Sequence, residues 1–167
     1  MKNKKMFTNF KKKYIIKKLN FMVKKDMKIA LGSDHGGYEL KEKVKTHLKN
    51  LGIEVLDFGT NSTQSVDYPV YAKKVCAEVL TENADFGILV CGTGLGMAIC
   101  ANKIKGIRAV TPENTFSAKM SRAHNNANVL TLGQRVLGEE LAYEIISAFL
   151  NTDYDGGRHQ KRIDMFE

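Results

Sequence analysis

The sequence predicts an α/β fold: a Rossmann-like, three-layer αβα arrangement with a five-stranded parallel sheet in a single domain. Short apolar runs alternate with helical patterns from Met27 onward, and such alternation produces right-handed βαβ units. The runs KIALG and GILVC are apolar on both faces, as buried strands of a parallel sheet are. Together these observations predict a doubly wound sheet with helices on both faces.

Strand and helix patterns alternate along the whole body of the chain. The expected strands are residues 28–32, 54–58, 86–91, 108–111 and 128–132. The expected helices are residues 38–51, 68–80, 96–104, 115–122 and 139–150. Pro69 and Pro112 lie near the starts of helical stretches, where proline is tolerated. No run approaches the roughly 18 consecutive apolar residues of a membrane-spanning helix, so no membrane partner is expected.

The basic charge is concentrated in a leader. The chain has 167 residues and a formal net charge of +8, from 26 Lys+Arg and 18 Asp+Glu. Residues 1–26 hold ten Lys and one Asp, a net of +9, so residues 27–167 carry a net of −1. Two interpretations of residues 1–26 stay open. These residues result from a start codon assigned too early in AT-rich DNA, with Met27 as the true start, or they form a Lys-rich tether or surface helix. A cleaved targeting peptide is disfavoured because no small-residue cleavage site follows.

The cysteines and histidines have no metal-binding spacing. They are Cys76, Cys91, Cys100, His35, His47, His124 and His159, without a CxxC or HxxxH pair. An odd cysteine count without a secretory signal predicts free thiols in a reducing cytoplasm. We therefore expect no metal site. The expected organisation is the leader 1–26, a single domain over 27–152 and a C-terminal segment over 153–167.

Polar residues follow the first expected strand in the run GSDHGG. Ligands of open α/β sheets bind at the carboxyl ends of the strands, which is where Asp34 and His35 fall. One interpretation is a helix-capping aspartate beside a polar turn. The other is a pair of side chains that reach the hydroxyls or ring oxygen of a substrate.

A glycine-rich loop follows the third expected strand. In the run CGTGLG, residues 91–96, alternate glycines allow several backbone N–H groups to face one anion, beside the start of a helix. The third glycine of a dinucleotide fingerprint would fall on Met97, and a Walker A loop would need Gly-Lys-Ser/Thr. One interpretation of Cys91 is a thiol activated by the helix N-terminus that follows it. The alternative is that Cys91 is a small buried residue of the core.

The remaining candidates lie near the C-terminal end of the chain. His124 and Asn125 end a helical stretch, and an imidazole there can transfer protons; helix capping is the alternative. Three of the five arginines beyond the leader are Arg135, Arg158 and Arg162, and arginine matches phosphate geometry. Arg158 and Arg162 are four apart, so one helical face could present both, unless they belong to a solvated tail.

Taken together, these motifs resemble the type B ribose-5-phosphate isomerase family, which also includes the galactose-6-phosphate isomerase subunits. The resemblance runs from about residue 27 to residue 162. It rests on six motifs in order: GSDHGG, DYP, CGTGLGMAICANK, GIRAV, RAHNNANVLTLGQR and GGRHQKR. Ala98 and Asn126 depart from the family pattern, which often has Ser and Asp there.

The resemblance implies an aldose–ketose isomerase of the pentose phosphate pathway that interconverts ribose 5-phosphate and ribulose 5-phosphate without a cofactor. Cys91 would be the base, Thr93 and the loop amides would stabilise the enediolate, and His124 would open the sugar ring. The implied substrate-binding residues are Asp34, His35, Tyr68, Gly92, Gly94, Leu95, Gly96, Asn125, Arg135, Arg158 and Arg162. Family sites lie at a subunit interface, which implies a homodimer or a dimer of dimers.

Two other functions compete with this prediction. The nearer alternative is a family member acting on a six-carbon substrate such as galactose 6-phosphate or allose 6-phosphate. The remote alternative is a non-catalytic protein whose basic leader binds nucleic acid. The near-neutral body and its set of candidate catalytic residues favour the isomerase, so no nucleic-acid partner is expected.

Overall fold

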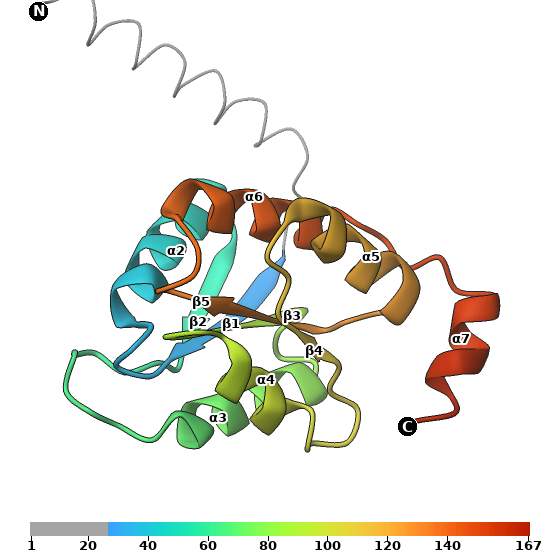
Figure 1. Cartoon of the computed structure of the whole chain (residues 1–167), viewed down its shortest axis with the longest axis horizontal. Helices are drawn as coiled ribbons and strands as arrows, with labels where there is room; N and C mark the ends of the chain where they lie inside the picture. Colours follow the sequence, from blue (N-terminus) through green and yellow to red (C-terminus); the bar gives the residue numbers. More distant parts are fainter. Residues whose placement is uncertain (1–26) are drawn as a thin grey trace, which may run out of the picture.

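The computed structural model describes residues 27–167, so the leader 1–26 and the expectations placed on it lie outside the described residues. Strands and helices alternate up to the final helices (Figure 1). The strands are β1 (Lys28–Ser33), β2 (Glu54–Asp57), β3 (Phe86–Cys91), β4 (Ala109–Val110) and β5 (Val129–Gly133). The helices are α2 (Tyr38–Asn50), α3 (Tyr68–Leu80), α4 (Leu95–Ala101), α5 (Thr115–Asn125), α6 (Glu139–Leu150) and α7 (Arg158–Ile163).

All the strand pairs are parallel, and the five-stranded sheet has the order β2-β1-β3-β5-β4. Helices α2, α5 and α6 cover one face and α3 and α4 cover the other (Figure 1). The predicted three-layer αβα fold is confirmed. Within residues 27–167, no helix combines the length and apolar character needed to cross a membrane.

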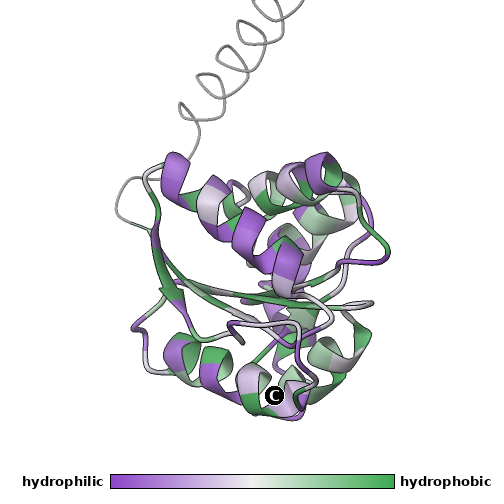
Figure 2. Cartoon of the chain, turned by 90° about the vertical axis from the view of Figure 1, so that its left-hand side faces the viewer, coloured by the Kyte–Doolittle hydropathy of each residue, from purple (hydrophilic) through white to green (hydrophobic). Residues whose placement is uncertain are grey.

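The strands are apolar on both faces because each face has its own core. Ile29 and Leu31 of β1 belong to the cluster under α2 and α6, whereas Ala30 between them belongs to the cluster under α3 and α4. Figure 2 shows these apolar strands between helices whose outward surfaces carry hydrophilic residues. This alternation is the physical reason that KIALG reads as a continuous apolar run.

Helices α4 and α5 differ most from their expected bounds. Helix α5 continues to Asn125 and ends where Asn126 adopts the left-handed conformation, with φ of 46°. Helix α4 starts at Leu95, directly after Gly94 with φ of 81°, and it ends at Ala101. Helix α7 adds an element beyond the expected helices and places Arg158 and Arg162 on one short helix.

A glycine brings α2 close to the end of β3. A Cβ atom at Gly37 would lie 2.3 Å from the carbonyl oxygen of Val90, a distance that no side chain tolerates. The loop after β1 therefore lies directly against the loop after β3. This close approach brings the two predicted polar loops to one edge of the sheet.

A buried ion pair joins α2 to β2. Lys41 is 1% exposed, and its Nζ lies 3.0 Å from Asp57 Oδ2 and 2.6 Å from Glu42 Oε1. Lys45 Nζ also donates to Asp57 Oδ2, at 2.8 Å. Burial raises the pKa of Asp57, but hydrogen bonds from Lys45, Lys41 and the Gly59 N–H outweigh it, so the pKa lies below its usual value.

We expect Asp57→Asn to lower the free energy of unfolding by about 1–3 kcal/mol at pH 7, because Lys41 would keep a buried charge with fewer partners. A carboxylate with a lowered pKa stabilises the fold above its unfolded pKa, and this contribution disappears as the pH falls. Urea unfolding at pH 7 and pH 3 should therefore show a difference between wild type and variant that shrinks at pH 3. Lys43→Gln, which breaks an exposed ion pair with Glu139, should have little effect at either pH. An equal loss at both pH values would contradict this account.

Candidate active site

The loops after β1 and β3 meet at the carboxyl edge of the sheet. Ser33 pairs with Val90 at the ends of these strands. A Cβ at Gly36 would lie 3.2 Å from the backbone nitrogen of Gly92. The structure therefore brings together the two motifs that the sequence placed at strand ends, Asp34–His35 and Cys91–Gly96.

Cys91 is the last residue of β3, and its thiol is held by the glycine loop. The side chain is 6% exposed, and Sγ accepts a hydrogen bond from the Gly94 N–H at 3.1 Å. Gly94 has φ of 81°, and a Cβ there would lie 2.7 Å from Thr111 Cγ2. Only glycine fits this conformation in this space. This hydrogen bond fixes the position of the sulfur at the end of β3, inside the loop.

Thr93 is part of this loop, and Tyr68 packs beside it. Thr93 Oγ1 accepts from the Leu95 N–H at 3.4 Å. The Tyr68 ring lies at the start of α3, and a Cβ at Gly96 would come within 3.2 Å of it. Tyr68 is 38% exposed, so its ring borders the loop and still faces solvent.

Asp34 and His35 have distinct local partners. Asp34 is 8% exposed, and its Oδ1 accepts from the Gly37 N–H at 3.1 Å, so this carboxylate stabilises the turn into α2. His35 Nδ1 accepts from the Val66 N–H at 3.1 Å. An imidazole that accepts at Nδ1 carries its proton on Nε2 when neutral. His35 can therefore donate from Nε2 to a substrate oxygen.

Arg135 supplies a positive charge over the same loop. The backbone N–H of Arg135 donates to the Gly92 carbonyl at 2.9 Å, which holds this residue beside the loop. A Cβ at Gly92 would lie 3.5 Å from the guanidinium carbon of Arg135. The side chain is exposed, so its guanidinium is available to an anion. We call Asp34, His35, Tyr68, the loop 91–96 and Arg135 the strand-end half-site.

His124 and Asn125 lie at the opposite edge of the sheet. Helix α5 runs antiparallel to the strands, so its last residues reach the edge where β4 and β5 begin. Arg108, directly before β4, donates from Nε to the Asn126 carbonyl at 3.0 Å. A five-residue strand such as β5 spans about 17 Å, so the two ends of the sheet are separated by about this length. The last turn of α5 therefore places His124 at the end of the sheet opposite to the one that holds Cys91.

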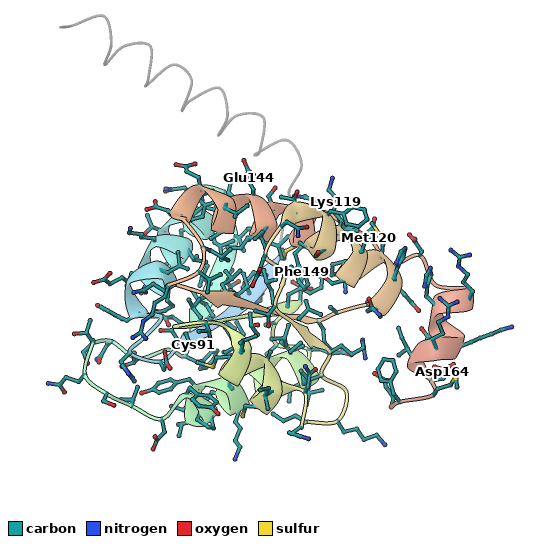
Figure 3. All side chains as sticks on the ribbon, viewed as in Figure 1. Cys91, Lys119, Met120, Glu144, Phe149 and Asp164 are labelled. Carbon is teal, nitrogen blue, oxygen red and sulfur yellow. The ribbon has the colours of Figure 1, made fainter. Side chains whose placement is uncertain are left out.

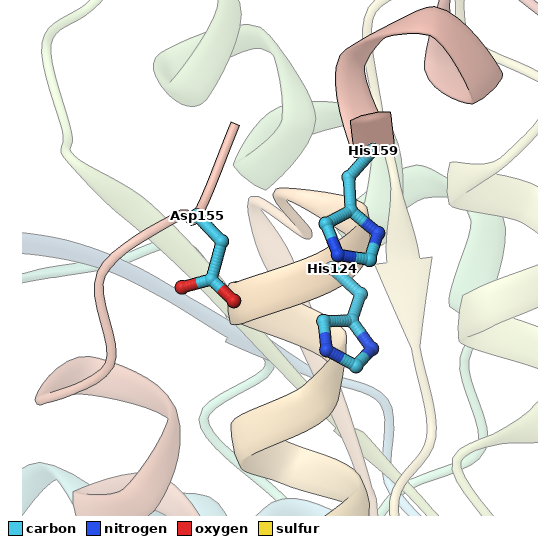
Figure 4. Close-up of side chains that lie close together, drawn as sticks. All are labelled: His124, Asp155 and His159. Carbon is cyan, nitrogen blue, oxygen red and sulfur yellow. The ribbon is translucent and has the colours of Figure 1, made fainter. Parts of the chain in front are cut away.

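Helix α7 packs beside the end of α5. The His124 and His159 rings stack with centroids 4.3 Å apart and planes 9° apart (Figure 4). Burial, His124, Arg158 and Arg162 all lower the pKa of His159, which places both arginines in its electrostatic neighbourhood. Figure 3 shows Cys91 beside the sheet and Asp164 at the far side of the molecule, on the segment that follows α7. We call His124, Asn125, Arg158 and Arg162 the α5/α7 half-site.

Arg122 fixes the end of α5, a role that the sequence did not reveal. It is 8% exposed, and its Nη1 donates to Asn126 Oδ1 at 2.9 Å and to the Ala127 carbonyl at 2.6 Å. Its guanidinium lies over the Phe86 ring, 4.6 Å from the centroid. The Arg122 side chain therefore donates to the side chain of Asn126. Asn126 is one of the two positions at which this chain departs from the pattern of the resembled family. Arg122 therefore stabilises the C-terminal end of α5, the helix that carries His124 and Asn125.

Comparisons with known proteins agree with this geometry. The profile of the family described as Ribose/Galactose Isomerase matches residues 29–166. Ribose-5-phosphate isomerase B of Escherichia coli (strain K12) is 50% identical over 137 residues, which cover 82% of this chain and 92% of that protein.

Solved structures agree as well. The ribose 5-phosphate isomerase of Thermotoga maritima has 56% identity and a TM-score of 0.83, over 84% of this chain and 97% of that one. The ribose-5-phosphate isomerase B of Clostridium thermocellum has 50% identity and a TM-score of 0.82, over 83% and 94% of the two chains. The chain belongs to the ribose/galactose isomerase family.

Proposed function

We propose that this protein is an aldose–ketose isomerase that interconverts D-ribose 5-phosphate and D-ribulose 5-phosphate through an enediolate, in the cytoplasm. The observation that carries the proposal is the Cys91 thiol held by the Gly94 N–H at a strand end, within a loop of backbone donors. The names of the relatives at 50–56% identity support ribose 5-phosphate as the substrate. The free thiols of Cys76, Cys91 and Cys100 fit a reducing compartment.

In this proposal, Cys91 moves one proton between two carbons. The thiolate removes the proton from C2 of the open-chain aldose, and the electron pair forms the C1–C2 double bond while O1 becomes negatively charged. The Thr93 hydroxyl and the loop N–H groups stabilise this oxygen. The Cys91 thiol then returns the proton to C1, O2 loses its proton to O1, and the ketose results.

His124 and the arginines act on other parts of the substrate. The His124 imidazole accepts the proton of the anomeric hydroxyl and donates one to the ring oxygen, which opens the furanose. Arg158 and Arg162, with Arg135 on the strand-end side, bind the phosphate. Phosphate binding supplies energy remote from the reacting carbons. Asn125, Asp34, His35 and Tyr68 contact sugar oxygens.

A homodimer completes the site in this proposal. The strand-end and α5/α7 half-sites lie at opposite edges of one sheet, so a second copy is needed to bring His124 to Cys91. Next to the glycine loop, Leu95 and Ile99 are one helical turn apart on α4 and are 58% and 64% exposed, and Val136 is 50% exposed. Apolar side chains this exposed beside the half-site support burial against a second copy.

A substrate panel tests the reaction and the substrate together. We expect ketose formation from D-ribose 5-phosphate to have a larger kcat/KM than isomerisation of D-allose 6-phosphate or D-galactose 6-phosphate. The family includes galactose isomerases, so a dominant hexose phosphate activity would replace the proposed substrate. Cys91→Ala, purified and assayed in parallel, should lose activity on every substrate. Activity that survives this substitution on every substrate would contradict the proposed base.

A further inference from the structure

Three side chains with metal-binding atoms meet where α7 packs on α5. His124, Asp155 and His159 each offer one ligand atom, and these atoms all lie within 4.8 Å of one another (Figure 4). In the stretch 27–167, no other group of His, Cys, Asp and Glu side chains meets this condition. The two histidines are 35 positions apart, so local spacing in the sequence could not predict their meeting.

The backbone around the cluster is held in place. The Asp155 N–H donates to the Ala123 carbonyl at 2.9 Å, which ties the loop before α7 to the last turn of α5. The backbone N–H of His159 donates to the Gly156 carbonyl at 3.1 Å. His159 is 7% exposed, whereas His124 is half-buried and Asp155 is exposed. One ligand is therefore fixed and the cluster is open to solvent on the side of Asp155.

The donor set suits a zinc-like ion. Two imidazole nitrogens and one carboxylate oxygen are common ligands of Zn²⁺, and three protein ligands leave a fourth position for water. Ligand atoms of a tetrahedral site with bonds of this length lie roughly 3.3 Å apart. Closing the cluster therefore shortens the separations of the ligand atoms by about 1.5 Å at most. The stacked rings must also rotate, because the lone pair of each nitrogen lies in the plane of its ring.

The loop after Asp155 can absorb such a movement. Gly156 and Gly157 have φ of 62° and 56°, and no atom would lie within 4 Å of a Cβ at either position. Two glycines in open space allow the loop to shift without displacing packed side chains. The open space beside these two glycines leaves room for the loop to adjust.

We propose that His124, Asp155 and His159 form a binding site for a divalent transition metal ion of the Zn²⁺ class, and that its occupancy inhibits isomerisation. A metal-bound imidazole nitrogen cannot accept or donate the proton needed to open the sugar ring. This inhibitory consequence rests on the proposed function of His124, whereas metal binding itself does not.

Neighbouring charge limits the affinity. Arg158 and Arg162 lie on the same short helix as His159 and repel a cation, while Asp155 contributes the one negative charge of the cluster. We therefore expect micromolar rather than tighter binding of Zn²⁺. Arg162→Gln should strengthen Zn²⁺ binding, which is the opposite of its expected effect on a sugar phosphate.

Titration of the full chain with CoCl₂ and ZnCl₂ tests the site without reference to activity. Co²⁺ should give visible d–d bands without a thiolate charge-transfer band, since the ligands are nitrogen and oxygen. Calorimetry with ZnCl₂ should show one site per chain, weakened at least about tenfold in Asp155→Asn and in His159→Gln. His47→Asn, which changes a histidine stacked on Tyr143 away from the cluster, should bind as wild type does.

Inhibition is measured in the same samples, relative to the zinc-free rate of each variant. Zn²⁺ should inhibit wild type and His47→Asn, and the concentration for half inhibition should rise at least about tenfold in Asp155→Asn. Absence of Co²⁺ bands, a thiolate band, or undiminished binding in both ligand variants would overturn the site. Binding without inhibition would overturn the inhibitory role. A protein without zinc-free isomerase activity would contradict the proposed function, and the titrations would still decide the metal site.

Discussion

Replacement of Cys91 by alanine is expected to lower kcat for ribose 5-phosphate isomerisation by about 10²–10⁴-fold, the usual contribution of a positioned acid–base group. The thiol is the last side chain of β3, and its Sγ already receives the Gly94 N–H at 3.1 Å. Alanine leaves the loop backbone and its donors in place but removes the group that carries the proton. The measurement is ketose formation from ribose 5-phosphate, with thermal unfolding followed by circular dichroism.

The other cysteines provide the matched control. Cys100 lies on the neighbouring helix α4, is half-buried and belongs to no half-site, so Cys100→Ala should retain nearly all activity. Cys91→Ser keeps an acceptor for the Gly94 N–H but is a far weaker base, so it should be nearly as inactive as Cys91→Ala. If Cys91→Ala kept kcat within a few-fold of wild type while folded, Cys91 would not be the base.

The fold was predictable because its strands carry a simple pattern. Residues 86–91 are apolar on both faces since Ile88 and Val90 pack under α2 and Leu89 packs under α3. The edge strand β4 was harder to delimit. It has two residues and pairs with β5 alone, so little of its pattern is imposed by the sheet.

The strand-end half-site was also predictable, because parallel strands place their carboxyl ends at one edge. The position of His124 was not, because it depends on the direction of α5 rather than on the order of motifs. Two more features are tertiary in origin. Arg122 acts through Asn126 and the Ala127 carbonyl, and His159 reaches His124 only because α7 packs on α5.

The two half-sites can be tested by mixing two inactive variants. Cys91→Ala lacks a working strand-end half-site and His124→Asn lacks a working α5/α7 half-site, so each homodimer should be nearly inactive. A mixed dimer should contain one site with both defects and one site with neither. Random exchange gives mixed dimers as half of the population, so the mixture should recover about one quarter of wild-type activity.

This complementation is the most direct test of a site shared between two copies of the chain. The variants are co-expressed with different affinity tags, the doubly tagged dimer is purified, and ribulose 5-phosphate formation is measured per chain. The purified mixed dimer should have about half of the wild-type kcat, from one intact site of two, with an unchanged KM. A mixed dimer that is no more active than the two variant homodimers would contradict the account. It would mean that Cys91 and His124 of the same chain act together, or that the two residues do not serve the same reaction.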